Sequence, residues 1–153
     1  MDRAVPGWLR AQWVRRPAWM NLLLLFCAWM SFVYLPWDLF VKPTAVDEEV
    51  WFGVVFRGVW AKVLALPHWA IYAAGLVGFW RMRPWMWPWA ALYAAQVALG
   101  MLIWPILYRG GPAGVAMGLV AGALFALPAW GLWRARDRFR PAEPPGLREA
   151  GGE

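Results

Sequence analysis

The sequence predicts an all-α integral membrane protein: an antiparallel four-helix transmembrane bundle with an interfacial or re-entrant segment before the second helix. The 153 residues are 62% hydrophobic and only 16% charged, whereas soluble domains carry about 25% charged residues. The chain also contains 15 tryptophans. So much apolar surface is compatible with a lipid bilayer but not with exposure to water. We expect one membrane domain over residues 1–140. A disordered cytoplasmic tail rich in Pro, Gly and Glu is expected at 141–153.

Four apolar runs form the predicted spans, at about 18–38, 64–80, 85–107 and 112–133. The first, third and fourth have the roughly 20 residues needed to cross about 30 Å of hydrocarbon at about 1.5 Å per residue. Tryptophans gather near the ends of the runs, as they do at membrane interfaces. These residues are Trp19, Trp37, Trp80, Trp85, Trp87, Trp104, Trp130 and Trp133.

The second span is the hardest to delimit because Pro67 lies near its predicted start. Residues 67–80 alone would extend roughly 21 Å, which is too short to span. A helix counted from Trp51 would extend roughly 45 Å, which is too long for a straight span. We therefore expect residues of about 50–63 to form a separate interfacial or re-entrant piece that bends into the span.

Basic residues predict how the chain is oriented. Eleven arginines lie in the N-terminal tail, in the turn after the second span and in the C-terminal tail. The other side has four basic residues, Lys42, Arg57, Lys62 and Arg109. By the positive-inside rule both termini are cytoplasmic, and we expect a bacterial inner (cytoplasmic) membrane. Since the net charge of +6 comes from these flanking runs, the expected partner is the lipid bilayer and not nucleic acid.

Small residues predict how the spans pack. Gly114, Gly118 and Gly122 follow one another at four-residue spacing in the fourth span. Glycines at this spacing allow the backbones of two membrane helices to approach closely. We expect this face to pack against a neighbouring helix of the same chain. A homodimer formed through the same face is the alternative.

Polar residues inside spans are costly and therefore informative. Three predicted helices each carry polar side chains at spacings that put them on one face. With one acidic residue from the loop before the second span, the candidate pocket residues are Ser31, Tyr34, Asp38, Glu49, His68, Tyr72, Tyr93 and Gln96. Their depths predict a polar pocket in the outer half of the bundle, with Asp38 at its entrance and close to His68. The alternative assigns each of them to a solvated helix end or an interhelical hydrogen bond.

Several chemistries are excluded by the residues present. The chain has a single cysteine, Cys27, and a single histidine, so we expect no metal site and no cofactor. It has no GxSxG, P-loop or HExxH motif. These observations favour a non-catalytic accessory subunit of a larger membrane complex, or a protein that binds a lipophilic small molecule. A small dimeric carrier is a further alternative.

A membrane-embedded acid/base enzyme is the other alternative, with Asp38 or Glu49 and His68 moving a proton on a sterol- or isoprenoid-like lipid. The arrangement of residues 18–133 resembles the EXPERA-type four-helix proteins, the group of the sterol isomerases. It shares Pro36 and Asp38 at the end of the first span, a long acidic first loop and four short spans. The resemblance implies a double-bond isomerase. The carboxylates that this family has inside its second span are not found here, so no residue is carried across.

The predicted threading can be tested by cysteine labelling. Single cysteines at Thr44 and Ala142, each in a chain whose Cys27 is replaced by alanine, should react with a membrane-impermeant maleimide from opposite sides of an intact membrane. The reason is the asymmetry of the basic residues, which keeps both termini in the cytoplasm. Labelling of both positions from the same side would refute the topology.

Overall fold

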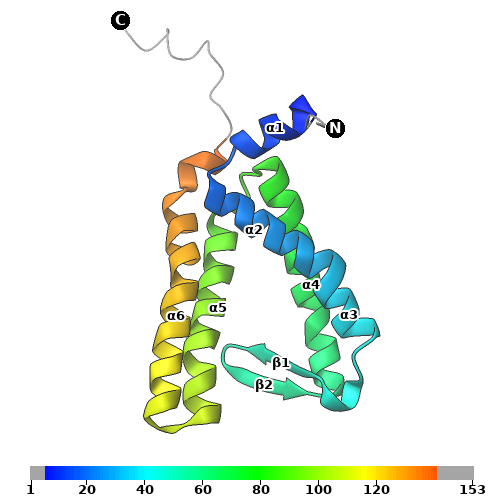
Figure 1. Cartoon of the computed structure of the whole chain (residues 1–153), viewed down its shortest axis with the longest axis vertical. Helices are drawn as coiled ribbons and strands as arrows, with labels where there is room; N and C mark the ends of the chain where they lie inside the picture. The colour runs from blue at the N-terminus through cyan, green and yellow to red at the C-terminus, as the bar shows by residue number, and fades with distance from the viewer. Residues whose placement is uncertain (1–5, 141–153) are drawn as a thin grey trace, which may run out of the picture.

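The computed structural model describes residues 6–140, which are mostly helical, with one β-hairpin (Figure 1). The segments predicted for the tail, at 141–153, lie outside the described residues. In chain order the elements are α1 (Gly7–Val14), α2 (Ala18–Trp29), the π-helical turn η1 (Met30–Tyr34), α3 (Leu35–Phe40), the 3-10 turn η2 (Thr44–Val46), β1 (Glu48–Trp51), β2 (Val54–Arg57), α4 (Val59–Arg81), α5 (Met86–Arg109), α6 (Gly111–Arg134) and the 3-10 turn η3 (Arg136–Phe139).

Four of the helical segments are long and apolar enough to cross a membrane, as the sequence predicts. They are Ala18–Phe40, Val59–Arg81, Met86–Arg109 and Gly111–Arg134. The first combines α2, η1 and α3 in one continuous rod. Its π-helical turn ends just before Pro36 at the start of α3. Proline has no backbone N–H to donate to the preceding turn, which accounts for a local change in the hydrogen-bond ladder here.

The segment predicted at 50–63 consists of two different elements, a β-hairpin and the first turn of α4. The strands are antiparallel, with Glu48 opposite Arg57 and Trp51 opposite Val54. The two residues between them, Phe52 and Gly53, have φ values of 51° and 84°. Two left-handed residues in a two-residue loop give the type I′ turn, whose twist matches that of the strands.

Helix α4 begins five residues earlier than predicted, at Val59, so Pro67 lies well inside it. Gly58 precedes it with a φ of 62°, a conformation that favours glycine. This sharp change of direction separates the hairpin from the helix. Residues 59–63, which the sequence analysis assigned to the separate segment, therefore belong to α4, and the boundary lies at Gly58.

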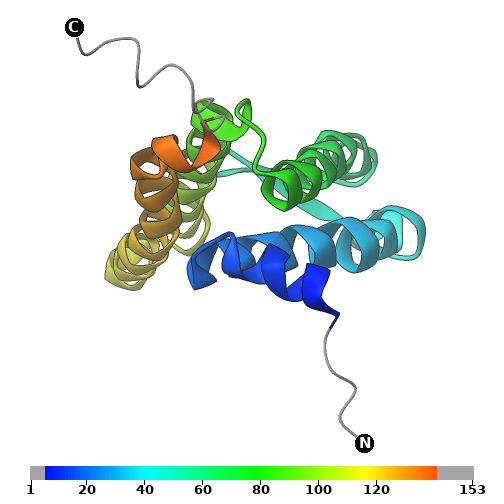
Figure 2. The same ribbon diagram turned by 90° about the horizontal axis from the view of Figure 1, so that it is seen from above.

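The hairpin lies between α4 and α5, near the end of the bundle opposite the N-terminus (Figures 1 and 2). A Cβ atom on Gly53 would lie 2.5 Å from Ile103 Cγ2, and one on Gly100 would lie 3.4 Å from the Gly53 nitrogen. The hairpin turn therefore touches the backbone of α5 where that helix has only a hydrogen as a side chain. The Val55 N–H donates a hydrogen bond to Tyr108 Oη at 3.2 Å.

Helices α5 and α6 pack closely along their length (Figure 1). Gly114, Gly118 and Gly122 are all buried. A Cβ atom on Gly114 would lie 2.7 Å from the Pro105 carbonyl oxygen, and one on Gly118 would overlap the Leu102 carbonyl oxygen. The glycine face is thus covered by α5 of the same chain. This is the packing within one chain that the sequence analysis expects for these glycines.

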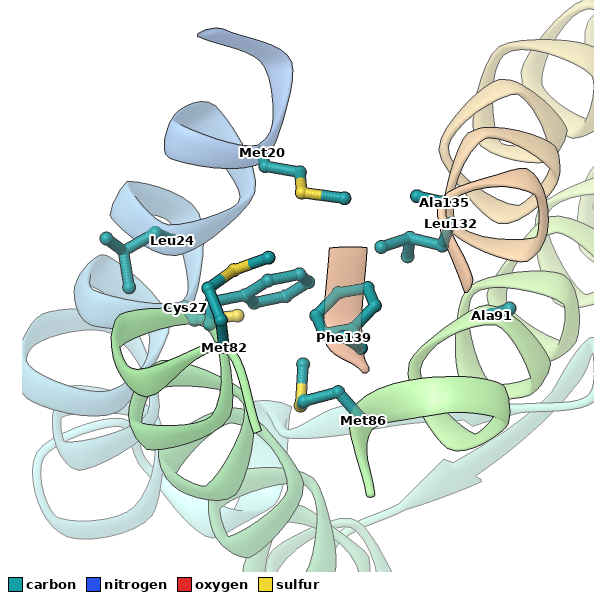
Figure 3. Packing of buried hydrophobic residues seen from close by; sticks show 10 residues of the cluster. Met20, Leu24, Cys27, Met82, Met86, Ala91, Leu132, Ala135 and Phe139 are labelled. Atoms are coloured by element: carbon teal, nitrogen blue, oxygen red, sulfur yellow. The ribbon is translucent and has the colours of Figure 1, made fainter. Parts of the chain in front are cut away.

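A hydrophobic core joins α2, α4, α5 and α6 at the end of the bundle where η3 lies (Figure 3). Phe139 of η3 is 2% exposed, and its ring centroid lies 6.3 Å from that of Phe79. Met20, Met82 and Met86 pack in the same cluster. Because methionine is flexible, it fills the irregular space between helices that meet at different angles.

Arg16 fastens the start of α2 to the end of α4. It is 4% exposed, and its Nη1 donates to the carbonyl oxygens of Phe79 and Trp80 at 3.0 and 3.1 Å. Its Nε donates to Asn21 Oδ1 at 2.9 Å. A cation at the carboxyl end of a helix is favoured by the helix dipole. Arg16 therefore has a structural role besides the topological one that the sequence indicates.

The close α5–α6 contact predicts that alanine substitutions at two glycines of α6 change the melting temperature differently. Gly118→Ala should lower the melting temperature in detergent, since overpacking a close contact typically costs about 1–3 kcal/mol. Gly131→Ala is the matched control, because its new Cβ would lie 3.6 Å from the Trp19 ring, an ordinary contact. This control should melt at the same or a slightly higher temperature, since alanine favours helix. Equal melting of both variants and the parent chain would contradict the packing.

Candidate ligand-binding site

An apolar cavity of about 610 Å³ lies between α2, α4, α5 and α6. Its walls are aliphatic and aromatic, with Phe26 from α2, Phe79 from α4, Trp89 from α5 and Phe125 from α6. The lining residues come from the half of each helix nearest to the hydrophobic core and η3. Under the predicted threading this is the cytoplasmic half, whereas the sequence predicted a polar pocket in the outer half.

Tyr72 and Tyr93 form the polar end of this cavity. Both line it, and their rings meet edge to face with centroids 5.8 Å apart. Beyond them lies His68, whose ring centroid is 6.2 Å from that of Tyr72 and 6.1 Å from that of Tyr93. The two tyrosines thus separate the apolar cavity from a histidine in the body of α4.

The hairpin supplies the partners of His68. Glu49 and Trp51 are two residues apart in β1, so their side chains lie on the same face of the strand. Glu49 Oε1 is in ion-pair contact with His68 Nδ1, and each side chain is only 13% exposed. The Trp51 ring stacks on the imidazole with centroids 4.2 Å apart and planes at 14°. β1 therefore fixes both the orientation and the plane of the histidine ring.

This arrangement has the parts of a proton-transfer site. When neutral His68 donates its Nδ1–H to the Glu49 carboxylate, its Nε2 carries the free lone pair and can accept a proton. The carboxylate would also stabilise the imidazolium formed by that step. Within residues 6–140, no three of the His, Cys, Asp and Glu side chains come together as metal ligands.

Two polar atoms near this site, Trp51 Nε1 and Gln96 Oε1, are buried and make no hydrogen bond within the described part of the chain. The Tyr93 hydroxyl has that of Tyr72 as its hydrogen-bonding neighbour. Gln96 lies between Tyr93 and Gly100 at helical spacing, so the three share the face of α5 that the hairpin contacts. Buried polar groups in native proteins are nearly always hydrogen-bonded. One donor and one acceptor thus lack a partner beside the histidine, while the polar side chains that line the cavity itself are Tyr72 and Tyr93.

A second polar cluster, formed by Asp38, Lys42, Asp47 and Lys62, joins α3, the following loop and α4. Asp38 and Asp47 are each 1% exposed. Lys42 Nζ lies 2.9 Å from Asp38 Oδ1 and 2.5 Å from Asp47 Oδ1, and Lys62 Nζ lies 3.0 Å from Asp47 Oδ2. Lys62 also donates to the backbone carbonyls of Asp38 and Lys42. Two buried negative charges are thereby matched by two lysines.

The pKa values in this cluster shift in the direction that keeps it charged. Burial alone would raise the pKa of Asp47, but hydrogen bonds from Lys42 and Lys62, with their charges, lower it. Burial would likewise lower the pKa of Lys42, but its hydrogen bonds to Asp47 and Asp38 raise it. The stability from Asp47 is lost as pH falls through its folded-state pKa, and that from Lys42 as pH rises through its own. The cluster therefore stabilises the fold across neutral pH.

The structure brings four of the predicted site residues together, Glu49, His68, Tyr72 and Tyr93, with Gln96 on the adjoining face. It places Asp38 elsewhere: the predicted partner, His68, pairs with Glu49, and Asp38 pairs with Lys42. The physical reason is that Lys42 is one turn from Asp38 on the same helical path. A flexible ammonium group satisfies a buried carboxylate at that distance more readily than an imidazole on another helix.

The remaining two predicted residues lie apart from the histidine cluster. Ser31 is buried, and its backbone carbonyl accepts a hydrogen bond from Trp69 Nε1 at 2.9 Å. Tyr34 packs between Trp29 and Trp37, with ring centroids 5.4 and 6.3 Å away. Both belong to the packing of the first rod. The sequence analysis did not include Trp51 among the site residues. If 48–51 had been recognised as a strand, Trp51 would have been expected on the same face as Glu49.

No protein-family model, no curated protein and no solved structure matches this chain.

The two polar clusters predict a specific pattern of coupling. In a double-mutant cycle on thermal unfolding in detergent, Glu49→Gln and His68→Ala should be non-additive by about 0.5–3 kcal/mol, as expected for residues in contact. Asp38→Asn combined with His68→Ala should couple less strongly, since these residues have different partners. A larger coupling for the Asp38 cycle than for the Glu49 cycle would overturn this assignment.

Proposed function

We propose that this chain is an integral membrane protein that binds a lipophilic small molecule in the cavity between α2, α4, α5 and α6. The observation that carries the proposal is the cavity itself: about 610 Å³, walled by apolar side chains, and ending at Tyr72 and Tyr93. Small-molecule sites usually have volumes of about 300–1,000 Å³, apolar walls and a few polar groups. Here the polar groups are concentrated at one end.

Membrane insertion is supported by the outward surface of the helices. Large apolar side chains point away from the core, among them Leu22 at 66%, Phe32 at 73% and Leu127 at 63% exposure. Soluble proteins rarely expose contiguous apolar surface of this extent. The distribution of basic residues in the sequence supports the orientation that we propose, with the four spans antiparallel across a bacterial inner membrane and both termini cytoplasmic. The cavity then lies in the cytoplasmic half and the hairpin in the outer half.

The walls define the chemistry of the ligand. A charged ligand would lose its hydration on entering walls that are almost wholly apolar, and nothing in those walls would replace it. A hydrocarbon body with one uncharged polar group fits better, with that group beside Tyr93 Oη. Long-chain isoprenoid alcohols and sterols are ligands of this class.

A second candidate function is proton transfer on the same ligand. The observation that favours it is the contact between Glu49 and His68 beside Tyr93, which places an acid/base pair next to the polar end of the cavity. Because Tyr72 and Tyr93 lie between the cavity and His68, the proton would pass through the Tyr93 hydroxyl to a carbon–carbon double bond of a bound isoprenoid or sterol. A proton would leave a neighbouring carbon by the same route. Incorporation of solvent deuterium into C–H bonds of the extracted lipid, lost in Glu49→Gln, would distinguish this activity from binding alone.

A cavity-filling substitution tests the binding function. Ala94 lines the cavity, whereas the adjacent Ala95 is exposed. In Ala94→Phe the added ring would occupy the cavity, so photolabelling by a diazirine derivative of a long-chain isoprenoid alcohol should fall at least severalfold. Ala95→Phe adds the same ring to the same helix outside the cavity and should label like the parent chain.

Mass spectrometry of the labelled peptides gives the site of capture, which should include α4 or α5 near Tyr93. Equal labelling of the two variants, or labels confined to the outer helix surfaces, would refute the cavity as the binding site. A diazirine derivative of phosphatidylcholine provides the measure of non-specific contact with bulk lipid.

A further inference from the structure

A second cleft, of about 320 Å³, lies at the end of the bundle where η3 folds back. It is lined by Pro84, Trp87, Arg136, Phe139 and Arg140. Pro84 and Trp87 belong to the turn from α4 into α5 and its first residues, and the other three belong to η3 and the residue after it. The cleft is therefore separate from the apolar cavity and opens at the end that carries most of the arginines.

The floor of this cleft is held rigidly. Phe139 is 2% exposed and belongs to the hydrophobic core. Trp87 Nε1 donates a hydrogen bond to the Trp133 carbonyl oxygen at 3.2 Å, and the two rings lie 5.4 Å apart. Because Phe139 is anchored, the backbone is held in place at Arg136, three positions before it in η3, and at Arg140, immediately after it.

Both arginines of the cleft are available to an anion. Arg136 Cζ lies 5.4 Å from the centroid of the Trp87 ring, an arrangement that leaves the guanidinium N–H groups free to donate. Arg140 pairs with Asp137 at 3.1 Å, but these side chains are 54% and 81% exposed. Such solvated pairs contribute little, so a stronger anionic partner can replace Asp137.

Under the proposed membrane insertion, the cleft lies at the depth of the lipid phosphates. Trp85, Trp87 and Trp133 are at the same helix ends, and tryptophans mark the membrane–water interface. Residues 134–140 contain four arginines and one aspartate. Under the predicted threading this basic end faces the cytoplasmic leaflet, whose anionic lipids attract clustered arginines.

We propose that the cleft binds the phosphate of an anionic phospholipid head group. Guanidinium groups donate two parallel hydrogen bonds to phosphate oxygens, which makes Arg136 and Arg140 suited to this anion. A volume of about 320 Å³ fits a head group and not a whole lipid. The acyl chains then lie outside the cleft, along exposed apolar residues such as Trp133. The inference rests on the membrane insertion in the proposed function but not on the apolar cavity.

Native mass spectrometry of the full chain tests the site, with phosphatidylglycerol and phosphatidylcholine of identical acyl chains as the probes. The parent chain should retain phosphatidylglycerol preferentially. Arg136→Gln/Arg140→Gln should reduce this preference roughly tenfold or more, since each arginine near anionic lipid contributes about 1 kcal/mol. Arg134→Gln/Arg138→Gln is the matched control, because it removes the same charge from the same segment outside the cleft, and it should change the preference much less.

A third variant keeps the test valid if the glutamine variant folds poorly. Arg136→Lys/Arg140→Lys conserves charge but lacks the two-bond geometry, so it should fall between the parent chain and the glutamine variant. If the two glutamine variants lowered the lipid preference equally, general surface charge would explain the binding, and the cleft would be refuted as its site. Binding of inorganic phosphate with no preference for phosphatidylglycerol would overturn the lipid assignment.

The cavity and the cleft can fail independently. Ala94→Phe should leave the preference for phosphatidylglycerol unchanged while abolishing isoprenoid labelling. A lost lipid preference in Arg136→Gln/Arg140→Gln with intact isoprenoid labelling would show two separate sites. If the parent chain shows lipid preference but no isoprenoid labelling, the binding function of the cavity is refuted and the cleft is not.

Discussion

The burial of two carboxylates determines where the rest of the site lies. Asp47 is held between Lys42 and Lys62, which places the loop after α3 against the first turns of α4. The next residue begins β1, so the strand must start from this point, and the Gly58 N–H closes the other end of the hairpin on the Asp47 carbonyl at 3.0 Å. Removing one partner of such a buried pair typically costs about 3–5 kcal/mol. The position of Glu49 and Trp51 against His68 follows from this arrangement.

Two glycine contacts then decide how the two halves of the bundle meet. The glycine face of α6 brings it close to α5, which makes these two helices one rigid unit. Gly100 of α5 admits the backbone of the hairpin turn at Gly53, so this unit is held away from α4 at that end. The hydrophobic core around Phe139 joins the helices at the other end. The apolar cavity lies between the hairpin contact and the hydrophobic core, because neither of them fills the space at the centre of the bundle.

Hydropathy alone was sufficient to predict the four helices, because a span of about 20 apolar residues has few alternatives. It could not reveal the hairpin. The residues flanking Phe52 and Gly53 are apolar on both strand faces, so the alternation typical of a strand is absent, and a phenylalanine at positive φ is unusual. The polar residues were recognised by their cost in an apolar span, which identified His68, Tyr72 and Tyr93. The contacts of His68 with Glu49 and Trp51 could not be predicted, since they depend on which helix β1 packs against.

The histidine site is therefore set by the hairpin as much as by the helices. Glu49 and Trp51 reach His68 from β1, while Tyr72 and Tyr93 reach it from α4 and α5. In the proposed binding mode, a polar ligand group meets Tyr93 on the rigid pair of α5 and α6, and the hairpin fixed by the Asp47 cluster lies beyond that tyrosine. Such a group meets donors and acceptors that are already oriented, so little ordering is required on binding. The same rigidity favours a ligand whose polar group is small, because the hairpin cannot withdraw without separating the buried charges of Asp47, Lys42 and Lys62.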